Sequence, residues 1–122
     1  MKIAVVSDDG RTISQHFGMA VYYVIYDIKE GRIVGRETKP KAAHDREGTA
    51  HSHGHHDPSI HNSMLSNAGD CEAIIARGMG WGAYEAIRQS GVRPYITDLV
   101  NADDAVDAYI EGTLVDHFER LH

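Results

Sequence analysis

The chain has little of several features that identify common protein classes. Its 122 residues include one cysteine, Cys71, three prolines and only 7% aromatic residues. A single thiol cannot form an intramolecular disulfide, which indicates a reducing compartment, and it excludes a four-thiolate iron–sulfur site within one chain. Any iron–sulfur cluster bound by this chain would therefore have to bring its own sulfides. We interpret Cys71 as a small buried residue at the entrance of a strand.

Basic clusters and long apolar runs are also missing. The formal net charge is -6 with histidine neutral, from 12 Lys and Arg against 18 Asp and Glu, and no run of five basic residues occurs. We therefore expect no nucleic-acid partner. The apolar runs at 3–6 and 21–25 are too short to cross a bilayer, and the first residues lack the apolar region of a secretory signal. We expect a cytoplasmic protein with no membrane partner.

The order of the predicted elements indicates an α/β fold. The length suits one domain, 1–122, that buries roughly two thirds of its unfolded surface. Dense apolar residues predict a central strand at 2–7 that is buried on both faces, and a hairpin at 21–28 and 32–38 follows. Further strands are expected at 73–76 and 93–97, and helices at 58–68, 83–90, 102–111 and 114–121. Three strands followed by two β-α units predict a mixed sheet covered by helices.

Histidine is the residue that the chain has in excess. An 18-residue window holds six of the nine: His44, His51, His53, His55, His56 and His61. Imidazole is the commonest protein ligand for zinc, copper, nickel and iron, and an extended chain places alternate residues on one side. The segment 41–57 has no apolar periodicity and is predicted to be a long loop. Two interpretations stay open: capture of a metal or cluster, or a solvated loop that binds metal adventitiously.

A second histidine, His16, lies in a different setting. It falls in the connection after the first strand, at the end of a central strand, where open α/β sheets place ligands. Phe17 offers an apolar anchor and Gly18 a permissive backbone, and together they would hold the imidazole in place. The alternative is an ordinary surface histidine.

A third pattern follows the predicted strand at 73–76, where glycines alternate into a helix. Glycine lets a ligand approach the backbone, and a helix N-terminus offers unpaired N–H groups to an anion. Met79 adds a thioether for a soft metal. We therefore expect an anion or cluster cradle formed by Gly78, Met79, Gly80, Trp81 and Gly82. The alternative is a tight strand-to-helix turn.

Two enzyme hypotheses compete with binding. Gly78, Gly80 and Ala83 match the spacing of a dinucleotide fingerprint, with Asp98 at a suitable distance, but the Trp81 indole stands where a pyrophosphate must approach. The paired acids at 8–9 suggest a two-metal nuclease, yet few other carboxylates end strands and the net charge is acidic. Neither hypothesis is favoured.

Four stretches together resemble the dinitrogenase iron-molybdenum cofactor biosynthesis family: KIAVVSDDG, ISQHFGMAVYYVIYDI, IIARGMGWGAYEAI and AVDAYIEGTL. The likeness covers nearly the whole chain apart from 41–57, and its most specific piece is His16-Phe17-Gly18. The resemblance implies a ribonuclease H-like fold of five strands flanked by helices. It also implies a small carrier that holds an iron–sulfur-based cofactor, or its precursor, during delivery to an apo-enzyme. The chain lacks the cysteine set and radical-enzyme domain of a full maturation protein, so assembly chemistry is not expected.

The residues and the resemblance together predict a non-enzymatic metallocluster carrier. The cargo would be the iron-molybdenum cofactor, its precursor or a related iron–sulfur cluster, exchanged with donor and acceptor proteins; a homodimer is left open. The expected cluster contacts are His16, Phe17, Gly18, Gly78, Met79, Gly80, Trp81 and Gly82, with His51, His53, His55 and His56 as auxiliary metal ligands beside His16. A divalent-metal buffer or sensor for zinc, nickel or copper is the alternative, and a nucleotide-binding enzyme the third hypothesis.

Overall fold

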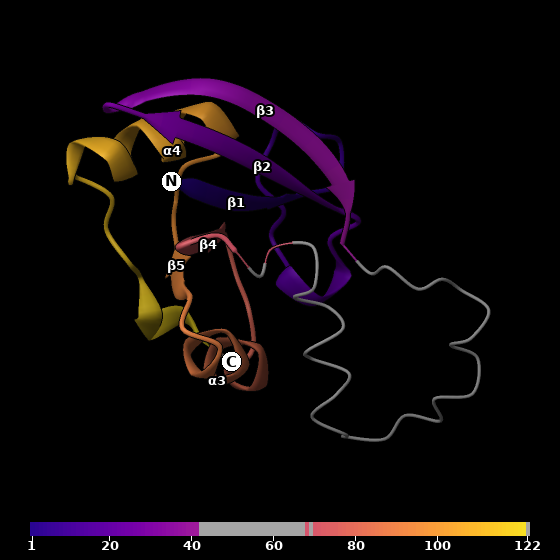
Figure 1. The fold of residues 1–122 in the computed structure, drawn as a ribbon. Helices are drawn as coiled ribbons and strands as arrows, with labels where there is room; N and C mark the ends of the chain where they lie inside the picture. The colour runs from indigo at the N-terminus through magenta and orange to yellow at the C-terminus, as the bar shows by residue number, and fades with distance from the viewer. Residues whose placement is uncertain (42–67, 69, 122) are drawn as a thin grey trace.

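A computed structural model describes residues 1–41, 68 and 70–121 of the chain. The elements are the strands β1 (Lys2–Ser7), β2 (Tyr22–Lys29), β3 (Arg32–Pro40), β4 (Ala73–Ala76) and β5 (Arg93–Ile96), the helices α3 (Trp81–Gln89) and α4 (Ala102–Glu111), and the 3-10 turns η1 (Phe17–Met19) and η4 (Phe118–Arg120). One sheet has the order β3-β2-β1-β4-β5 (Figure 1). β2 runs antiparallel to β1 and β3, whereas β4 runs parallel to β1 and β5. The prediction of an α/β fold with a five-stranded mixed sheet is confirmed.

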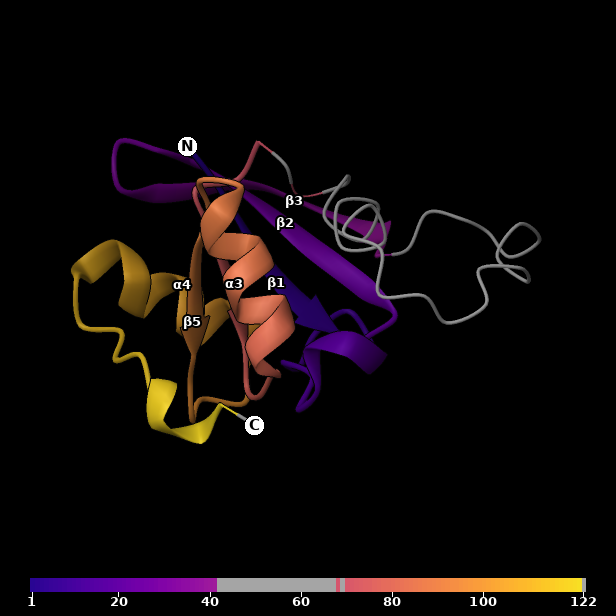
Figure 2. The ribbon, with the colours of Figure 1, turned by 90° about the horizontal axis from the view of Figure 1, so that it is seen from below.

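The central strand β1 is buried on both faces, as its continuous apolar sequence predicts. Its alternate side chains enter two apolar clusters: Val6 belongs to the cluster that contains Ile87 of α3, and Val5 belongs to the cluster that contains Val106 of α4. The two helices therefore cover opposite faces of the sheet (Figures 1 and 2). This arrangement leaves the ends of the strands, and not the faces, free to form a site.

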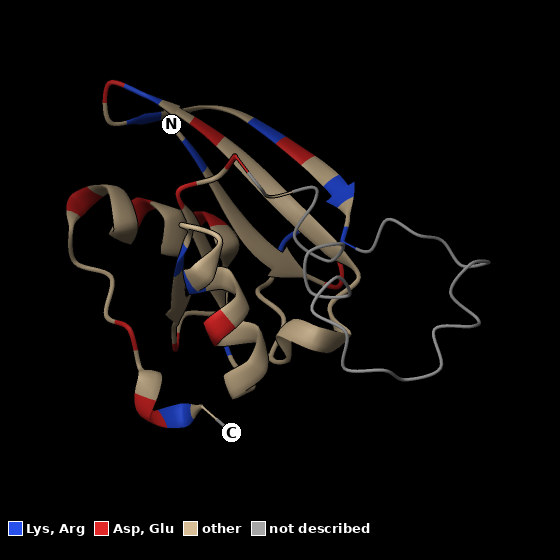
Figure 3. Ribbon diagram, turned by 60° about the horizontal axis from the view of Figure 1, so that its bottom comes forward, with Lys and Arg blue, Asp and Glu red and all other residues tan. Residues whose placement is uncertain are grey.

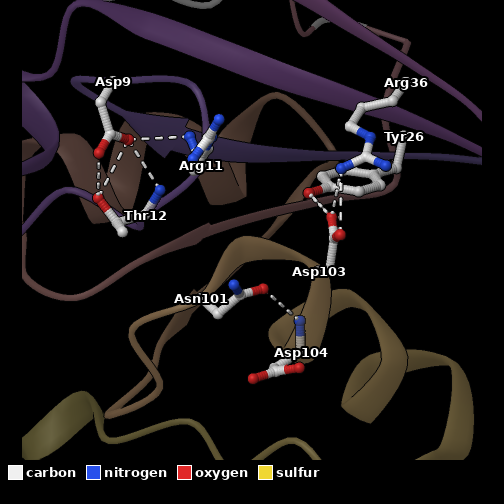
Figure 4. Close-up of polar contacts among 8 residues, drawn as sticks. All are labelled: Asp9, Arg11, Thr12, Tyr26, Arg36, Asn101, Asp103 and Asp104. Atoms are coloured by element: carbon white, nitrogen blue, oxygen red, sulfur yellow. Dashed lines mark hydrogen bonds and ion pairs between the residues drawn. The ribbon is translucent and has the colours of Figure 1, made fainter.

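Local signals set several boundaries as expected. Glu30 and Gly31 form the hairpin turn with positive φ angles of 54° and 77°. The Asp104 N–H donates to the Asn101 side chain at 3.2 Å and so caps α4, which ends at Gly112 in the left-handed conformation (Figure 4). These turns and caps depend on side chains next to the backbone that they stabilise, which is why the sequence reveals them.

The edge strand β3 is tied to the helix α4 by one carboxylate. Asp103 accepts a hydrogen bond of 2.6 Å from the Tyr26 hydroxyl, and one terminal nitrogen of Arg36 donates to both of its carboxylate oxygens, at 2.9 and 3.1 Å (Figure 4). Charged residues of both signs lie along β3: Arg32, Arg36, Glu37 and Lys39 (Figure 3). Charges on an edge strand oppose pairing with a second sheet, so β3 is protected against edge-to-edge association.

Two predicted boundaries are wrong by two residues, and one predicted helix does not form. β3 runs on to Pro40. Helix α3 begins at Trp81, two residues early, because its N-cap, Gly80, has no side chain to signal the start. The predicted helix at 114–121 is replaced by the three-residue turn η4. The reason is tertiary: the Ile96 N–H donates to the Asp116 carboxylate at 2.9 Å, and the His117 N–H donates to the Ile96 carbonyl at 2.8 Å. Both bonds draw the tail along the edge of β5.

The predicted helix at 58–68 except its last residue, most of the histidine-rich loop at 41–57, and His61 lie outside the described residues. Among residues 1–41, 68 and 70–121, no helix is long and apolar enough to cross a membrane.

Candidate functional site

The loop that follows β1 is organised by the carboxylate of Asp9. One carboxylate oxygen accepts hydrogen bonds from the N–H groups of Arg11 and Thr12, both at 2.8 Å, and from the Thr12 hydroxyl at 3.1 Å (Figure 4). These donors hold the pKa of Asp9 well below its ordinary range. Ser7 closes the turn by donating its hydroxyl to the Thr12 carbonyl at 2.6 Å. Asp9 thus stabilises the loop and is not a free ligand.

Asp8 is also engaged by its own loop. One oxygen accepts the Val21 N–H at 3.2 Å, and the other lies 3.2 Å from the Ser14 hydroxyl. Within the described part of the chain, no three His, Cys, Asp or Glu side chains lie close enough to hold a metal ion. The two-metal nuclease hypothesis therefore finds no support in these residues.

His16 precedes η1, and the buried side chain of Phe17 anchors this turn in the core. The Phe17 ring is 2% exposed in the apolar core, and the Lys41 ammonium lies 4.5 Å from its centroid. The Met19 N–H donates to the His16 carbonyl at 3.1 Å, so the two residues bracket a single turn. His16 is the extended N-cap residue of this turn, and Met19 is its last residue. The exposed imidazole of His16 and the Met19 thioether, 77% exposed, line one cleft.

The expected role of Phe17 as an anchor agrees with this burial, whereas Gly18 does not need to be glycine. A Cβ built on Gly18 would meet nothing within 4 Å, and its φ is not in the left-handed region. An alanine could therefore be placed there without strain. The sequence analysis missed Met19; its spacing of three from His16 was the available signal.

The glycine segment meets the His16 loop through backbone contacts. The Arg77 N–H donates to the Ser14 carbonyl at 3.0 Å, and the Phe17 N–H donates to the Gly78 carbonyl at 2.9 Å. A Cβ on Gly78 would lie 2.5 Å from the Gln15 carbonyl oxygen. Gly78 is therefore required by the close approach of two loops of the protein itself. The structure brings together the two segments that the sequence singled out separately.

Of the other residues of the predicted cradle, Met79 is buried in the core, and the rest lie at the start of α3. Met79 is 1% exposed in the core and does not line the cleft, so the expectation that its sulfur faces a cluster is not supported. Trp81, 58% exposed, and Gly82 lie in the first turn of α3. Gly80 caps this helix without a side-chain hydrogen bond, and no acidic residue lies in the first turn. The helix N-terminus therefore keeps its attraction for anions.

The cleft itself lies at the carboxyl ends of the parallel strands β1 and β4. Its volume is about 620 Å³, and its lining residues are Asp8, Thr12, Ile13, Ser14, Gln15, His16, Met19, Arg77 and Val100. The Arg77 Nε is buried and has no hydrogen-bond partner in the described part of the chain. Figure 2 shows η1, the arrowhead of β1 and the N-terminal end of α3 at the same end of the molecule. The site thus combines an imidazole, a thioether and a guanidinium whose Nε has no partner among the described residues.

Arg77 was a second omission of the sequence analysis. It directly follows the strand β4, and ligands of open α/β sheets bind outside the carboxyl ends of the strands. Its position was therefore an available signal, and it also lies in the stretch IIARGMGWGAYEAI, of which only the residues from Gly78 onward were assigned to the cradle.

Two further groups of predicted residues are not found among the lining of the cleft. The auxiliary ligands His51, His53, His55 and His56 lie outside the described residues. Cys71 is buried before β4, as predicted, and burial raises the pKa of its thiol to about 11. A protonated, buried thiol is a poor metal ligand.

Comparisons with known proteins agree with this architecture. An uncharacterized protein of Methanocaldococcus jannaschii is 31% identical over 114 residues, which cover 93% of this chain and 89% of that protein. A solved structure from Thermotoga, described as a putative NifB protein, has 25% identity and a TM-score of 0.65 over 94% of this chain and 91% of its own. The apo form of the orange protein of Desulfovibrio gigas shares the fold at 18% identity, with a TM-score of 0.68 and coverage of 94% and 91%.

The family of this chain is shown by a match to a protein-family sequence model. The match covers every described element except the C-terminal tail. The model named dinitrogenase iron-molybdenum cofactor matches residues 1–112, which include both the His16 loop and the glycine segment. The chain belongs to the dinitrogenase iron-molybdenum cofactor family.

Proposed function

We propose that this chain binds an iron–sulfur-based metallocluster in the cleft and passes it on without catalysing a reaction. The cargo is the iron-molybdenum cofactor, its precursor or a related cluster. The observation that carries the proposal is that His16, Met19 and Arg77 line one open cleft at the carboxyl ends of β1 and β4. Membership of the family supports the same conclusion.

The donors of the cleft suit a preformed cluster. Such a cluster carries its own sulfides and a negative charge, so it needs few bonds to protein. The His16 imidazole and the Met19 thioether are borderline and soft ligands for its metal atoms. The Arg77 guanidinium supplies positive charge and hydrogen-bond donors, including the buried Nε that has no acceptor among the described residues. The N-terminus of α3, whose N-cap Gly80 makes no side-chain hydrogen bond, adds a further favourable potential.

The same geometry favours release. Two metal ligands on an exposed turn hold a cluster less firmly than a closed cage of four protein ligands would. We therefore propose that the protein exchanges its cargo with donor and acceptor proteins, in the cytoplasm, on a ribonuclease H-like domain. In this proposal the histidines at 51–56 act as auxiliary ligands.

The test is to produce the protein anaerobically in a host that makes iron-molybdenum cofactor. Iron, molybdenum and acid-labile sulfide are then measured per chain. We expect all three in the wild type, loss of most of the cluster in His16→Ala, and partial loss in Met19→Leu and Arg77→Gln. His117→Gln is the matched control, since His117 lies outside the cleft and pairs with Asp98. Equal loading of His16→Ala and His117→Gln would contradict the proposal.

A divalent-metal buffer is the second candidate, and the histidine-rich window is the observation that favours it. Deletion of residues 44–56 separates the two functions. A buffer loses all of its metal on deletion, whereas a cluster carrier keeps a cluster that His16→Ala removes. Zinc or nickel without acid-labile sulfide in the purified protein would favour the buffer.

A further inference from the structure

The negative charge of the chain is concentrated in one segment. Residues 97–119 contain seven Asp and Glu and no Lys or Arg, whereas the remaining residues hold 11 acids and 12 bases. The segment forms the loop after β5, the helix α4 and most of the tail, and Figure 3 shows acidic residues along this part of the ribbon. The net charge of -6 therefore belongs to one region of the molecule, and the His16 cleft does not explain it.

Three of these acids lack an ion-pair partner among the described residues: Asp104, Asp107 and Glu111. All three are exposed on α4. The other four accept ion pairs or hydrogen bonds within the protein: Asp98, Asp103, Asp116 and Glu119. Like charges three or four positions apart on a helix repel each other. The exposed face of α4 thus carries negative charge that no cation of the described structure balances.

A small apolar hollow lies beside α4, between this helix, the loop after β5 and the tail. Its volume is about 200 Å³, and its apolar lining consists of Leu99, Ala108, Leu114 and Val115. Two titratable side chains also line it, Asp98 and His117, but they pair with each other at 3.2 Å. Val115 is 61% exposed and Leu99 is 37% exposed. The contacts that remain open to an occupant are therefore apolar.

Ala108 connects the hollow with the unbalanced acids. Residues three and four positions apart are neighbours on a helix surface, so Asp104 and Glu111 flank Ala108 on α4. The hollow therefore has an acidic rim on its α4 side. Its volume is below the roughly 300–1,000 Å³ that is usual for small-molecule sites. The hollow has the size to take one large side chain of a protein, and not a whole small molecule.

The charge of the rim decides between a second copy of this chain and a different protein. A symmetric dimer places the same patch of both subunits in contact. Such a contact would bring Asp104 and Glu111 of both copies together, and like charges across an interface are unfavourable. A protein that carries Lys or Arg beside an apolar side chain is attracted to the same surface.

The hollow adjoins the His16 cleft through one loop. Leu99 lines the hollow, and the next residue, Val100, lines the cleft. The Ile13 N–H donates to the Val100 carbonyl at 2.8 Å, which ties this loop to the loop that leads to His16. A protein held in the hollow would therefore lie beside the cleft.

We propose that this hollow docks a protein that exchanges the metallocluster, through one large apolar side chain flanked by Lys or Arg. The proposal rests on the proposed function, because a carrier needs its exchange partner beside the cleft. The apolar side chain fills the hollow and supplies most of the affinity, as buried anchor residues do at other interfaces. The flanking cations pair with Asp104 and Glu111, which speeds association and fixes the orientation of the partner.

The test is a titration of the 15N-labelled, cluster-free full chain with synthetic peptides, followed by NMR of its backbone amides. The first peptide has one Trp with Arg and Lys one helical turn away on both sides, in an alanine background. The second has Ser in place of the Trp, and the third has Gln in place of every Arg and Lys. We expect saturable shifts of the amides of residues 97–99 and 104–117 with the first peptide. The other two should bind at least about tenfold more weakly.

A pair of valine variants tests the apolar contact. Val115→Ser should weaken binding of the first peptide at least about tenfold. Val34→Ser is the matched control, because Val34 lies on β3 and has a similar exposed fraction, 55% against 61% for Val115. It should leave the affinity within about twofold. The spectrum of each variant also reports whether it is folded.

A pair of double variants tests the acidic rim. Asp104→Asn with Glu111→Gln should weaken binding at least about tenfold at low salt and should reduce its dependence on salt concentration. Glu37→Gln with Glu85→Gln removes the same charge from exposed positions on β3 and α3 and should leave both properties nearly unchanged.

The proposal is overturned if the first peptide gives no saturable shift up to about 1 mM. It is also overturned if the second peptide binds as well as the first, or if Val115→Ser binds as Val34→Ser does. Shifts of the same amides that grow with the concentration of the chain alone would assign the hollow to a second copy and reject a different partner. Because the titration uses cluster-free protein, its result is separate from the presence or absence of iron and sulfide in the loading experiment.

Discussion

Replacement of Gly78 by alanine tests how the two loops of the cleft are held together. The new Cβ would lie 2.5 Å from the Gln15 carbonyl oxygen, about 0.9 Å closer than the 3.4 Å at which ordinary contacts begin. The neighbour is backbone, held by hydrogen bonds on either side, from Arg77 to Ser14 and from Phe17 to Gly78. It cannot rotate away as a flexible side chain would, so the loops must separate.

The expected cost follows from three effects. Overpacking costs about 1–3 kcal/mol. Weakening of one flanking hydrogen bond adds about 1 kcal/mol, and the lower entropy of the unfolded alanine chain offsets about 0.5–1 kcal/mol. We therefore expect Gly78→Ala to lower the free energy of unfolding by about 2 kcal/mol, which corresponds to a fall in Tm of about 8 °C for a chain of this length.

Urea unfolding followed by circular dichroism measures this difference directly. Gly18→Ala is the matched control, because Gly18 lies in η1 of the same loop and a Cβ there meets nothing within 4 Å. We expect it to leave stability unchanged or to raise it by up to about 1 kcal/mol. The reasoning is refuted if Gly78→Ala unfolds within about 0.5 kcal/mol of the Gly18→Ala protein.

Three further predictions concern titratable groups. The pKa of Asp9 is lowered in the folded state, so its ionised form contributes stability above its unfolded pKa of about 3.9, and this contribution is lost as the pH falls below that value. Asp9→Asn should therefore be less stable than the wild type at pH 7, and thermal melts should show the gap closing in acid; a constant gap would contradict this. Burial lowers the pKa of Lys41 to about 8, so the unfolded chain binds more protons between about pH 8 and pH 10 and wild-type stability rises there. Lys41→Met should remove that rise. It should also stabilise the protein at pH 7 by about 1–3 kcal/mol, reduced by the loss of the contact between Lys41 and Phe17. Urea unfolding at pH 7 and at about pH 10 measures both effects, and a rise that persists in the variant would show that another group causes it. Burial raises the pKa of Cys71 to about 11, so iodoacetamide at pH 8 should alkylate the native thiol at least about a hundredfold more slowly than the unfolded one; equal rates by mass spectrometry would show the thiol to be accessible.

Elements that carry their own signal were predictable. The uninterrupted apolar residues of β1 indicated burial on both faces, and Asn101 and Gly112 bounded α4 because each stabilises the helix end beside it. Helix α3 was placed two residues late because Gly80 carries no capping side chain. The C-terminal tail has a helical apolar period, but its hydrogen bonds to Ile96 lie far away in sequence.

The sequence alone determined the family, the mixed sheet and the two segments around His16 and Gly78, because these follow from local patterns that a short stretch of chain contains. Only the tertiary structure decided how these two segments contact each other. It placed Gly78 against Gln15 and buried Met79 in the core. It brought Arg77 and Met19, instead of Met79, to the cleft. The physical reason is that a cleft is formed by elements distant in the chain, and its shape depends on how closely their backbones approach.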